Sequence, residues 1–259
     1  MKRIMLVVSY DGTVYAGWQF QPGQPTIEGE LNKALSGLTR EDIHVVGASR
    51  TDAGVHAEGN VCIFDTESRI PAEKFCYALN THLPEDIVVQ NSEEVPNWFH
   101  PRKCRCIKTY EYKIWNADHV RPFNRKYTNF VYHDLDIEKM RAGAAYLVGE
   151  HDFTGYCSIH TTVPDHVRTI LAADVIKEGD LITIRVTGNG FLYNMVRIIA
   201  GTLIQVGDGT KSPEDVKKAL DACDRSLAGP TAPAMGLTLV RIDYPAKNRA
   251  EYDKDDIKE

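Results

Sequence analysis

Hydrophobic and polar positions repeat with two different periods along the first hundred residues. Short apolar runs predict strands at residues 4–8, 43–48, 60–66 and 87–90. Apolar residues at helical spacing predict helices over residues 27–38 and 72–83, the second beginning after Pro71. The resulting order, β-α-β-β-α-β, is typical of a ferredoxin-like unit.

A similar order returns in the second half of the chain. Residues 108–115 alternate as in a strand, so Tyr110, Tyr112 and Ile114 are expected on one face. The remaining predicted elements are helices at residues 137–148, 193–206 and 213–221, a hairpin at 166–187 that turns at 178–180, and a strand at 237–244. We therefore expect an α+β fold of two ferredoxin-like halves, with largely antiparallel sheets and a cleft between them.

The domain boundary is expected where the first pattern ends and the second begins. This gives an N-terminal domain at residues 1–106 and a C-terminal domain at residues 107–246. The last nine residues, 251–259, hold five acids and two lysines, which is three (5 − 2) of the six net negative charges. Residues 247–259 are thus predicted to be a flexible acidic tail, and the body is closer to neutral than the total of -6 suggests.

Composition narrows the class of protein without identifying it. The chain of 259 residues is 43% hydrophobic and 25% charged, which is ordinary globular usage. Its six cysteines contain no C-x-x-C pair, which argues against a zinc ribbon or a thioredoxin motif. The first apolar run stops at Val8, too short for a signal peptide, and no apolar stretch approaches a membrane span. We expect a cytoplasmic protein without a membrane partner.

The segment "GASRTDAGVHA", residues 47–57, holds the strongest chemical candidate. Asp52 could belong to an ordinary turn, with Gly54 at positive φ. Alternatively, Arg50 could pair with Asp52 and keep its carboxylate ionised, which suits a nucleophile rather than a general acid. His56 is a lone histidine beside this loop and is expected at the surface.

The same segment resembles the signature of the TruA family of tRNA pseudouridine synthases. Other segments resemble further family motifs in the expected order: residues 10–19, 80–87, 99–114, 188–207 and 229–244. The resemblance runs from about residue 4 to about residue 245, which is nearly the whole chain. An ordered series of this length is far more specific than any one motif.

The resemblance implies an isomerase that converts uridine to pseudouridine at positions 38, 39 and 40 of the tRNA anticodon stem-loop. It implies that Asp52 is catalytic, that Arg197 pairs with it, that Tyr110 stacks on the target uracil, and that Arg50 contacts the flipped nucleotide. It also implies a homodimer with one tRNA lying across both subunits, and no metal or other cofactor. Whether the aspartate attacks the base, attacks the sugar or deprotonates the sugar is left open.

Each of these residues also has a structural interpretation. Tyr110 and Tyr112 could both be core aromatics, which is the usual fate of alternating strand tyrosines. The resemblance favours Tyr110 at the site and Tyr112 in the core. Arg197 lies within a mostly apolar predicted helix, where it is either solvated on a polar face or paired, because an unpaired buried arginine is costly.

Two basic runs bracket the Tyr110 strand and could contact RNA phosphates. They are Arg102, Lys103, Arg105 and Lys108 in the first run, and Arg121, Arg125 and Lys126 in the second. A charge run usually marks a solvated face, so the position beside Tyr110 is what favours RNA.

Three rival functions fit less well. "SYDGT" lacks the nucleophilic aspartate of a dehalogenase-like phosphatase, because Ser9 stands in its place. "GDGTKS" does not have the spacing of a phosphate-binding P-loop. A non-catalytic RNA-binding or tRNA-chaperone protein on the same scaffold is the remaining alternative, although it would be expected to have lost Asp52.

Overall fold

The computed structural model describes residues 1–159, 161 and 163–245, so the tail predicted at residues 247–259 lies outside the described residues. The chain forms two compact units, one of residues 1–106 with the chain from Leu239 onward, the other of Ile107–Thr238. Both units combine helices with mostly antiparallel strands, which confirms the predicted α+β class.

The first unit has the predicted order β-α-β-β-α-β. Its elements are β1 (Lys2–Tyr10), η1 (Gly12–Val14), α1 (Ile27–Thr39), β2 (Val46–Gly47), β3 (His56–Thr66), η2 (Ala72–Lys74), α2 (Phe75–Leu79) and β4 (Ile87–Val95). The strands follow the order β4-β1-β3, β2 pairs with β3, and each of these pairs is antiparallel. The strand β10 (Leu237–Asp243) follows β3 in this order.

Two elements of the first unit are shorter than predicted. The expected strand at 43–48 is reduced to β2, since Ile43 and Val45 donate their N–H groups to side chains of α1. The expected helix at 72–83 ends at Leu79. The side-chain amide of the next residue, Asn80, bonds the backbone of Val89 on β4: its Nδ2 donates to the Val89 carbonyl oxygen at 2.9 Å, and its Oδ1 accepts from the Val89 N–H at 2.8 Å.

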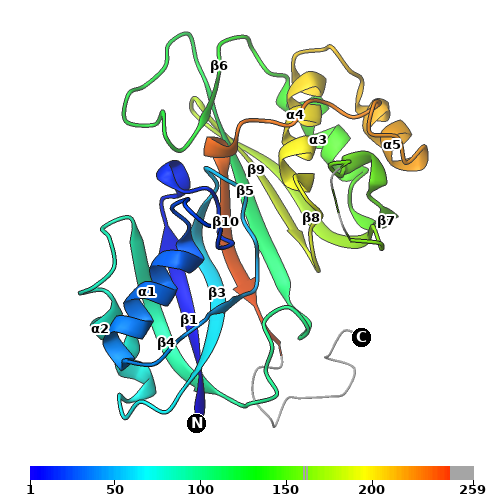
Figure 1. The fold of residues 1–259 in the computed structure, drawn as a ribbon. Coiled ribbons are helices and arrows are strands. Elements are labelled where there is room, and N and C mark those ends of the chain that lie inside the picture. Colours follow the sequence, from blue (N-terminus) through cyan, green and yellow to red (C-terminus); the bar gives the residue numbers. More distant parts are fainter. Residues whose placement is uncertain (160, 162, 246–259) are drawn as a thin grey trace. The chain divides into compact units, whose positions relative to one another are not determined.

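Helix α1 supplies one side of the core of the first unit. Thr26 caps its N-terminus by accepting from the Gly29 N–H at 3.2 Å, and Arg40 in the left-handed region ends it. Its buried face contains Ile27, Leu31, Ala34 and Leu35. The two helices α1 and α2 lie side by side (Figure 1).

The second unit is built around a hairpin. Its elements are β5 (Ile107–Asn116), β6 (Asn129–Val131), α3 (Ile137–Ala145), β7 (Gly149–Asp152), η3 (Thr154–Tyr156), β8 (Val167–Glu178), β9 (Leu181–Gly188), α4 (Met195–Gly207), α5 (Pro213–Asp221) and η4 (Ala234–Gly236). The strands follow the antiparallel order β5-β9-β8-β7, and β6 pairs with β5 in parallel. Strands β6 and β7 were not predicted, because they are too short to show a period.

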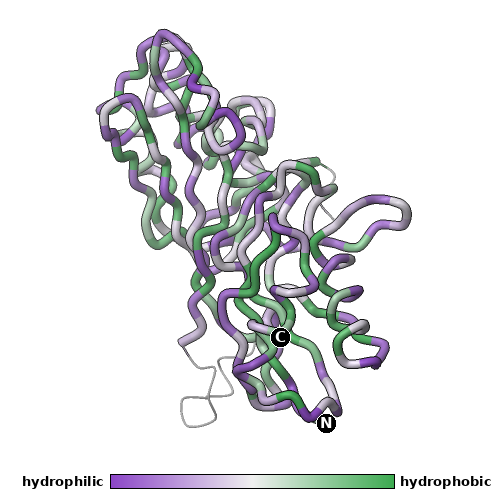
Figure 2. The backbone as a smooth tube through the Cα atoms, turned by 90° about the vertical axis from the view of Figure 1, so that its left-hand side faces the viewer, coloured by the Kyte–Doolittle hydropathy of each residue, from purple (hydrophilic) through white to green (hydrophobic). Residues whose placement is uncertain are grey.

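The hydropathy pattern positions the core of this unit. Along β9, Ile182, Ile184 and Val186 are buried, and the residues between them are not; Figure 2 shows the hydropathy along the chain. Helix α4 is buried over most of its circumference and packs against α3 and α5. None of the helices in the described ranges combines the length and apolar character that crossing a membrane requires.

Two helical glycines allow a matched test of this packing. A Cβ at Gly201 of α4 would lie 1.9 Å from the Pro230 carbonyl oxygen, whereas a Cβ at the exposed Gly37 of α1 meets nothing within 4 Å. We expect Gly201→Ala to lower the free energy of unfolding by about 1–3 kcal/mol through overpacking. We expect Gly37→Ala to raise it by up to about 1 kcal/mol, because alanine is the better helix former. Denaturant unfolding measures both, and equal effects of the two changes would contradict this account.

Candidate functional site

Asp52 lies in a loop of the first unit that joins β2 to β3, here called the Asp52 loop (residues 48–55). The Val55 N–H donates to the Asp52 carbonyl oxygen at 3.1 Å across a turn that contains Gly54 at φ 76°. A turn with positive φ at its third position favours glycine, so the turn interpretation of this segment is correct. The same turn leaves Asp52 half-buried and Arg50 exposed.

A buried polar network holds the start of this loop. Asn60 of β3 is 0% exposed, and its Nδ2 donates to the Tyr10 hydroxyl at 3.2 Å and to the Ser49 carbonyl oxygen at 3.1 Å. The Tyr10 hydroxyl also bonds the Thr51 hydroxyl at 2.7 Å. Buried polar groups that are satisfied in this way fix one backbone arrangement, because each broken hydrogen bond would leave a buried donor or acceptor unsatisfied and so cost free energy. The residues on the N-terminal side of Asp52 are therefore rigidly placed.

The N-terminal segment "YDGTVYAGW" packs directly against the Asp52 loop. A Cβ at Gly12 would lie 2.0 Å from the Val55 carbonyl oxygen, and a Cβ at Gly17 would lie 2.7 Å from that of Thr51. The Trp18 N–H donates to the same Thr51 oxygen at 3.0 Å. Glycine is required at both positions because two backbones touch there. The motif at residues 10–19 thus has a structural role in supporting the loop.

His56 is buried, so its expected place at the surface was wrong. It is 4% exposed at the start of β3, and its Nδ1 accepts from the Gly12 N–H at 3.1 Å. The same nitrogen lies 3.2 Å from Oδ1 of Asp11. The ring therefore ties the N-terminal segment to the end of the Asp52 loop, which no local sequence pattern could indicate.

Arg50 shares its surroundings with a second arginine of the first unit. Burial, followed by the positive charge of Arg50, lowers the pKa of the Arg102 guanidinium, and Glu28 acts in the opposite direction. Burial and then the charges of Arg102 and Lys103 lower the pKa of His100. Within the described residues, neither Arg50 nor Arg102 forms an ion pair with a carboxylate. Arg102 and Arg50 thus lie close enough to contribute to one positive region of the first unit.

Tyr110 lies in the second unit, on β5 opposite Val186 of β9. It is 8% exposed, and its ring meets the Phe191 ring edge-on, with centroids 5.0 Å apart and planes at 77°. Phe191 was not singled out from the sequence, although it follows directly on the glycine segment 188–190. The edge contact fixes the plane of the Tyr110 ring.

Arg197 and Tyr112 come together in the same unit. Tyr112 is 0% exposed, and its hydroxyl donates to the Pro233 carbonyl oxygen at 2.9 Å. Burial raises its pKa, while the positive charge of Arg197 acts in the opposite direction. Arg197 is half-buried, and its Nε donates to the Ala232 carbonyl oxygen at 2.7 Å. Arg197 is therefore hydrogen-bonded within its own unit and only partly exposed to solvent.

A further positioning residue for Arg197 was missed from the sequence. Asn194, at the N-terminus of α4, accepts from Nη1 of Arg197 at 2.9 Å and has φ 61°. Asparagine is one of the few residues other than glycine that adopt this left-handed conformation readily. The spacing of three residues before Arg197 is a signal that could have indicated the contact.

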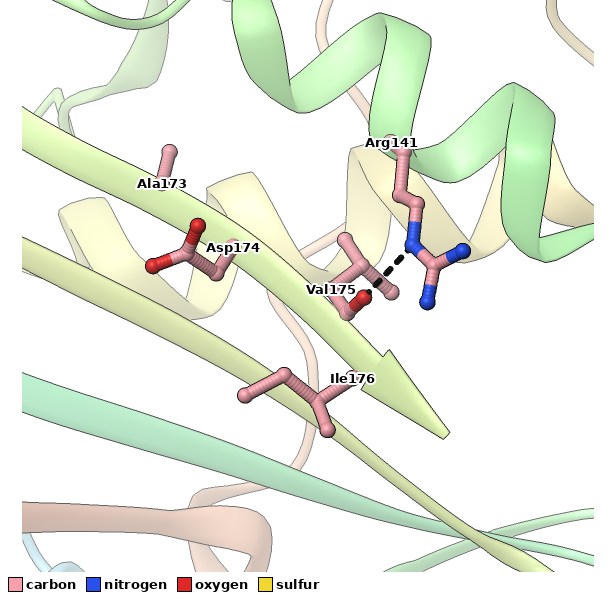
Figure 3. A pocket seen from close by; sticks show the side chains of 5 residues that line it. All are labelled: Arg141, Ala173, Asp174, Val175 and Ile176. Atoms are coloured by element: carbon pink, nitrogen blue, oxygen red, sulfur yellow. Dashed lines mark hydrogen bonds between the residues drawn. The ribbon is translucent and has the colours of Figure 1, made fainter. Parts of the chain in front are cut away.

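A surface hollow of the second unit is separate from the four predicted site residues. Arg141 of α3 and residues 173–176 of β8 line it (Figure 3). The Arg141 Nε donates to the Val175 carbonyl oxygen at 2.9 Å, and its Nη1 donates to Glu138 at 2.6 Å. The bond to Val175 links α3 to β8, and the bond to Glu138 lies within α3, so the arginine has a structural role.

Comparisons with known proteins show the family to which the chain belongs. The sequence model of a family described as tRNA pseudouridine synthase matches residues 6–102 and 144–245. The tRNA pseudouridine synthase A of Brevibacillus brevis is 49% identical over 244 residues, covering 94% of this chain and 100% of that protein. Those of Ruminiclostridium cellulolyticum and Bacillus subtilis are 48% and 46% identical, covering 94% and 93% of this chain and 100% and 99% of those proteins.

These matches define the class as an RNA-modifying isomerase. The chain belongs to the tRNA pseudouridine synthase family. Arg50, Asp52 and Arg197 lie inside the ranges that match the family, while Tyr110 lies in the interval between them.

The buried network beneath the Asp52 loop can be tested by removing its donor. We expect Asn60→Ala to lower the free energy of unfolding by about 1–3 kcal/mol, because the Tyr10 hydroxyl and the Ser49 carbonyl lose a buried partner. Asn91→Ala is the control, since Asn91 is an exposed asparagine on β4 of the same sheet, and its effect should stay within about 0.5 kcal/mol. Denaturant unfolding measures both, and indistinguishable values would refute the role given to Asn60.

Proposed function

We propose that this chain converts uridine to pseudouridine at positions 38, 39 and 40 of the tRNA anticodon stem-loop. The observation that carries the proposal is the presentation of Asp52. Asp52 lies in a turn that contains Gly54, and its loop is held by the buried network of Asn60 and by close backbone contacts with Gly12 and Gly17. The chain that carries this loop matches the family over residues 6–102 and 144–245. A family motif held this rigidly fits a catalytic loop, because catalytic groups need a fixed geometry.

The reaction needs few chemical groups from the protein. The N-glycosidic bond of uridine breaks, the uracil turns, and a new bond forms through C5, with no redox change. A stacked target base first leaves the stack, which costs a few kcal/mol. Asp52 then acts as the nucleophile or the proton acceptor, on the base or on the sugar. A carboxylate that is ionised suits either role.

The other predicted residues are assigned to the substrate and to the positioning of the site. Tyr110 is proposed to stack on the target uracil, and Arg50 to contact the flipped nucleotide or its phosphate. Arg197 is proposed as the positioning cation for the catalytic carboxylate. The proximity of Arg50 to Arg102 supports the assignment of Arg50, because two like charges favour an anionic ligand such as a phosphodiester.

Assembly and location complete the proposal. We infer a cytoplasmic homodimer, in which one tRNA lies across both subunits and modest basic surfaces act together. A non-catalytic RNA-binding protein is the second candidate, and it would bind tRNA without altering uridine.

The nucleophile is tested by tritium release from tRNA that carries 5-tritiated uridine. Wild type should release tritium, and Asp52→Asn should lower the rate by about 10⁴-fold or more, as expected when an essential nucleophile is lost. Asp134→Asn, at an exposed aspartate outside the Asp52 loop, should behave like wild type. Equal release by Asp52→Asn and wild type would reject the nucleophile. No release by a wild type that binds tRNA would favour the second candidate. Replacing uridines 38, 39 and 40 by cytidine should abolish release if the positions are right.

The hydroxyl of Tyr110 is tested separately from its ring. We expect Tyr110→Phe to keep tRNA affinity, because the ring and its edge contact with Phe191 remain, and to lose turnover. Tyr110→Ala should also weaken binding, by about 1–3 kcal/mol for one lost stacked base. Filter binding and tritium release measure the two properties. Full turnover by Tyr110→Phe would remove any catalytic role of the hydroxyl and leave stacking alone.

A further inference from the structure

A long loop joins β5 to β6 in the second unit and is here called the 117–128 loop (Figure 1). Its two ends are tied together by Asn116, whose Nδ2 donates to the carbonyl oxygens of Val131 and His133 at 3.0 and 2.8 Å. The loop lies outside the ranges 6–102 and 144–245 that match the family.

The base of the loop is anchored by an aromatic contact. The Arg121 guanidinium lies 4.4 Å from the centroid of the Trp115 ring, and the Trp115 Nε1 donates to the His119 carbonyl oxygen at 3.1 Å. A cation over an indole ring is attracted by the negative face of the ring. These contacts hold the first part of the loop close to β5.

The tip of the loop is ordered by two successive turns. The Asn124 N–H donates to the Arg121 carbonyl oxygen at 3.0 Å, and the Tyr127 N–H donates to that of Asn124 at 2.9 Å. The Arg125 Nη1 donates to the Pro122 carbonyl oxygen at 2.8 Å. The tip thus keeps a defined shape, and a shape fixed in advance lowers the entropic cost of binding a ligand.

Phe123 is held at this tip with its side chain 94% exposed. Single exposed apolar residues are common and need no explanation by themselves. Phe123 differs because its neighbours are cations. The loop carries Arg121, Arg125 and Lys126 against the single acid Asp118, a net charge of 3 − 1 = +2 in a chain of net charge -6.

This combination favours RNA over a protein partner. The centres of protein–protein interfaces are depleted of charged residues, whereas the loop that carries Phe123 holds three cations within three residues of it. Nucleic-acid sites that take unpaired strands combine an aromatic ring, on which a base stacks, with cations that follow the phosphates. Resting on the proposed function, we propose that the 117–128 loop is a second RNA contact. In it Phe123 stacks on an unpaired base of the tRNA, other than the target, and Arg125 holds a neighbouring phosphodiester.

Filter binding of an unmodified tRNA transcript to the full chain tests the stacking contact. We expect Phe123→Ala to raise the Kd about tenfold, the order expected for one lost stacked base, and Phe123→Trp to restore it. The control is Tyr77→Ala, because Tyr77 is also an exposed aromatic, at 69%, with the Lys74 Nζ 5.4 Å from its ring centroid. An unchanged Kd for Phe123→Ala, or an equal rise for Tyr77→Ala, would overturn the proposal.

The phosphate contact is tested by salt dependence. Arg125→Ala should reduce the slope of log K against log salt by about one, the amount for one phosphate contact. An unchanged slope would overturn this part of the assignment.

Two further measurements separate the possible failures. Sedimentation of Phe123→Ala tests a protein interface, and a changed oligomeric state with an unchanged Kd would assign the loop to a subunit contact instead. Tritium release by wild type is measured in parallel. A wild type that binds tRNA but releases no tritium refutes the proposed function, while the Kd values still decide the role of the loop. A wild type that does not bind tRNA overturns the loop proposal as well.

Discussion

The contact between two stretches of backbone, residues 10–18 and the Asp52 loop, is the constraint on which the candidate site depends. It exists because Gly12 and Gly17 have no Cβ; with one, each would lie within 2.7 Å of a carbonyl oxygen of the loop. Backbones that approach this closely leave no room for a water layer, so the loop cannot drift away from the sheet. The placement of Asp52 therefore depends on the packing of its loop against residues 10–18.

Buried hydrogen bonds also hold the Asp52 loop against the N-terminal segment. Asn60, Tyr10 and Thr51 form a buried chain of hydrogen bonds, and His56 adds a second tie between Gly12 and the end of the loop. Buried polar groups contribute little net stability when satisfied, but cost much when a partner is lost. Such a network therefore selects one loop conformation more than it stabilises the fold, which suits a loop that must present a carboxylate in a fixed direction.

Local periodicity was sufficient to predict the order of elements, and long-range contacts account for what it missed. The pattern identified β1, β3 and β4 from short apolar runs and α1 from apolar residues at helical spacing. It could not show that the second predicted helix would stop at Leu79, or that the Asn80 side chain would bond the backbone of Val89 on β4. Asp52 and Arg50 were visible in one motif, and the spacing of Asn194 and Arg197 was a usable local signal, whereas the role of Asn60 depends on Tyr10, a partner fifty residues away that only the folded backbone brings near. The turn at residues 52–55 and the loop that carries the candidate residue Asp52 are one segment.

The distribution of charge gives a physical reason to expect an anionic partner. Burial and the charge of Arg50 both lower the pKa of the Arg102 guanidinium, and Glu28 acts in the opposite direction. Surface cations of an acidic chain would normally be offset by its many carboxylates, yet neither of these guanidiniums forms an ion pair within the described residues. A phosphodiester would remove this repulsion and accept bidentate hydrogen bonds from arginine. The local arrangement of charges is thus better suited to RNA than the net charge of the whole chain suggests.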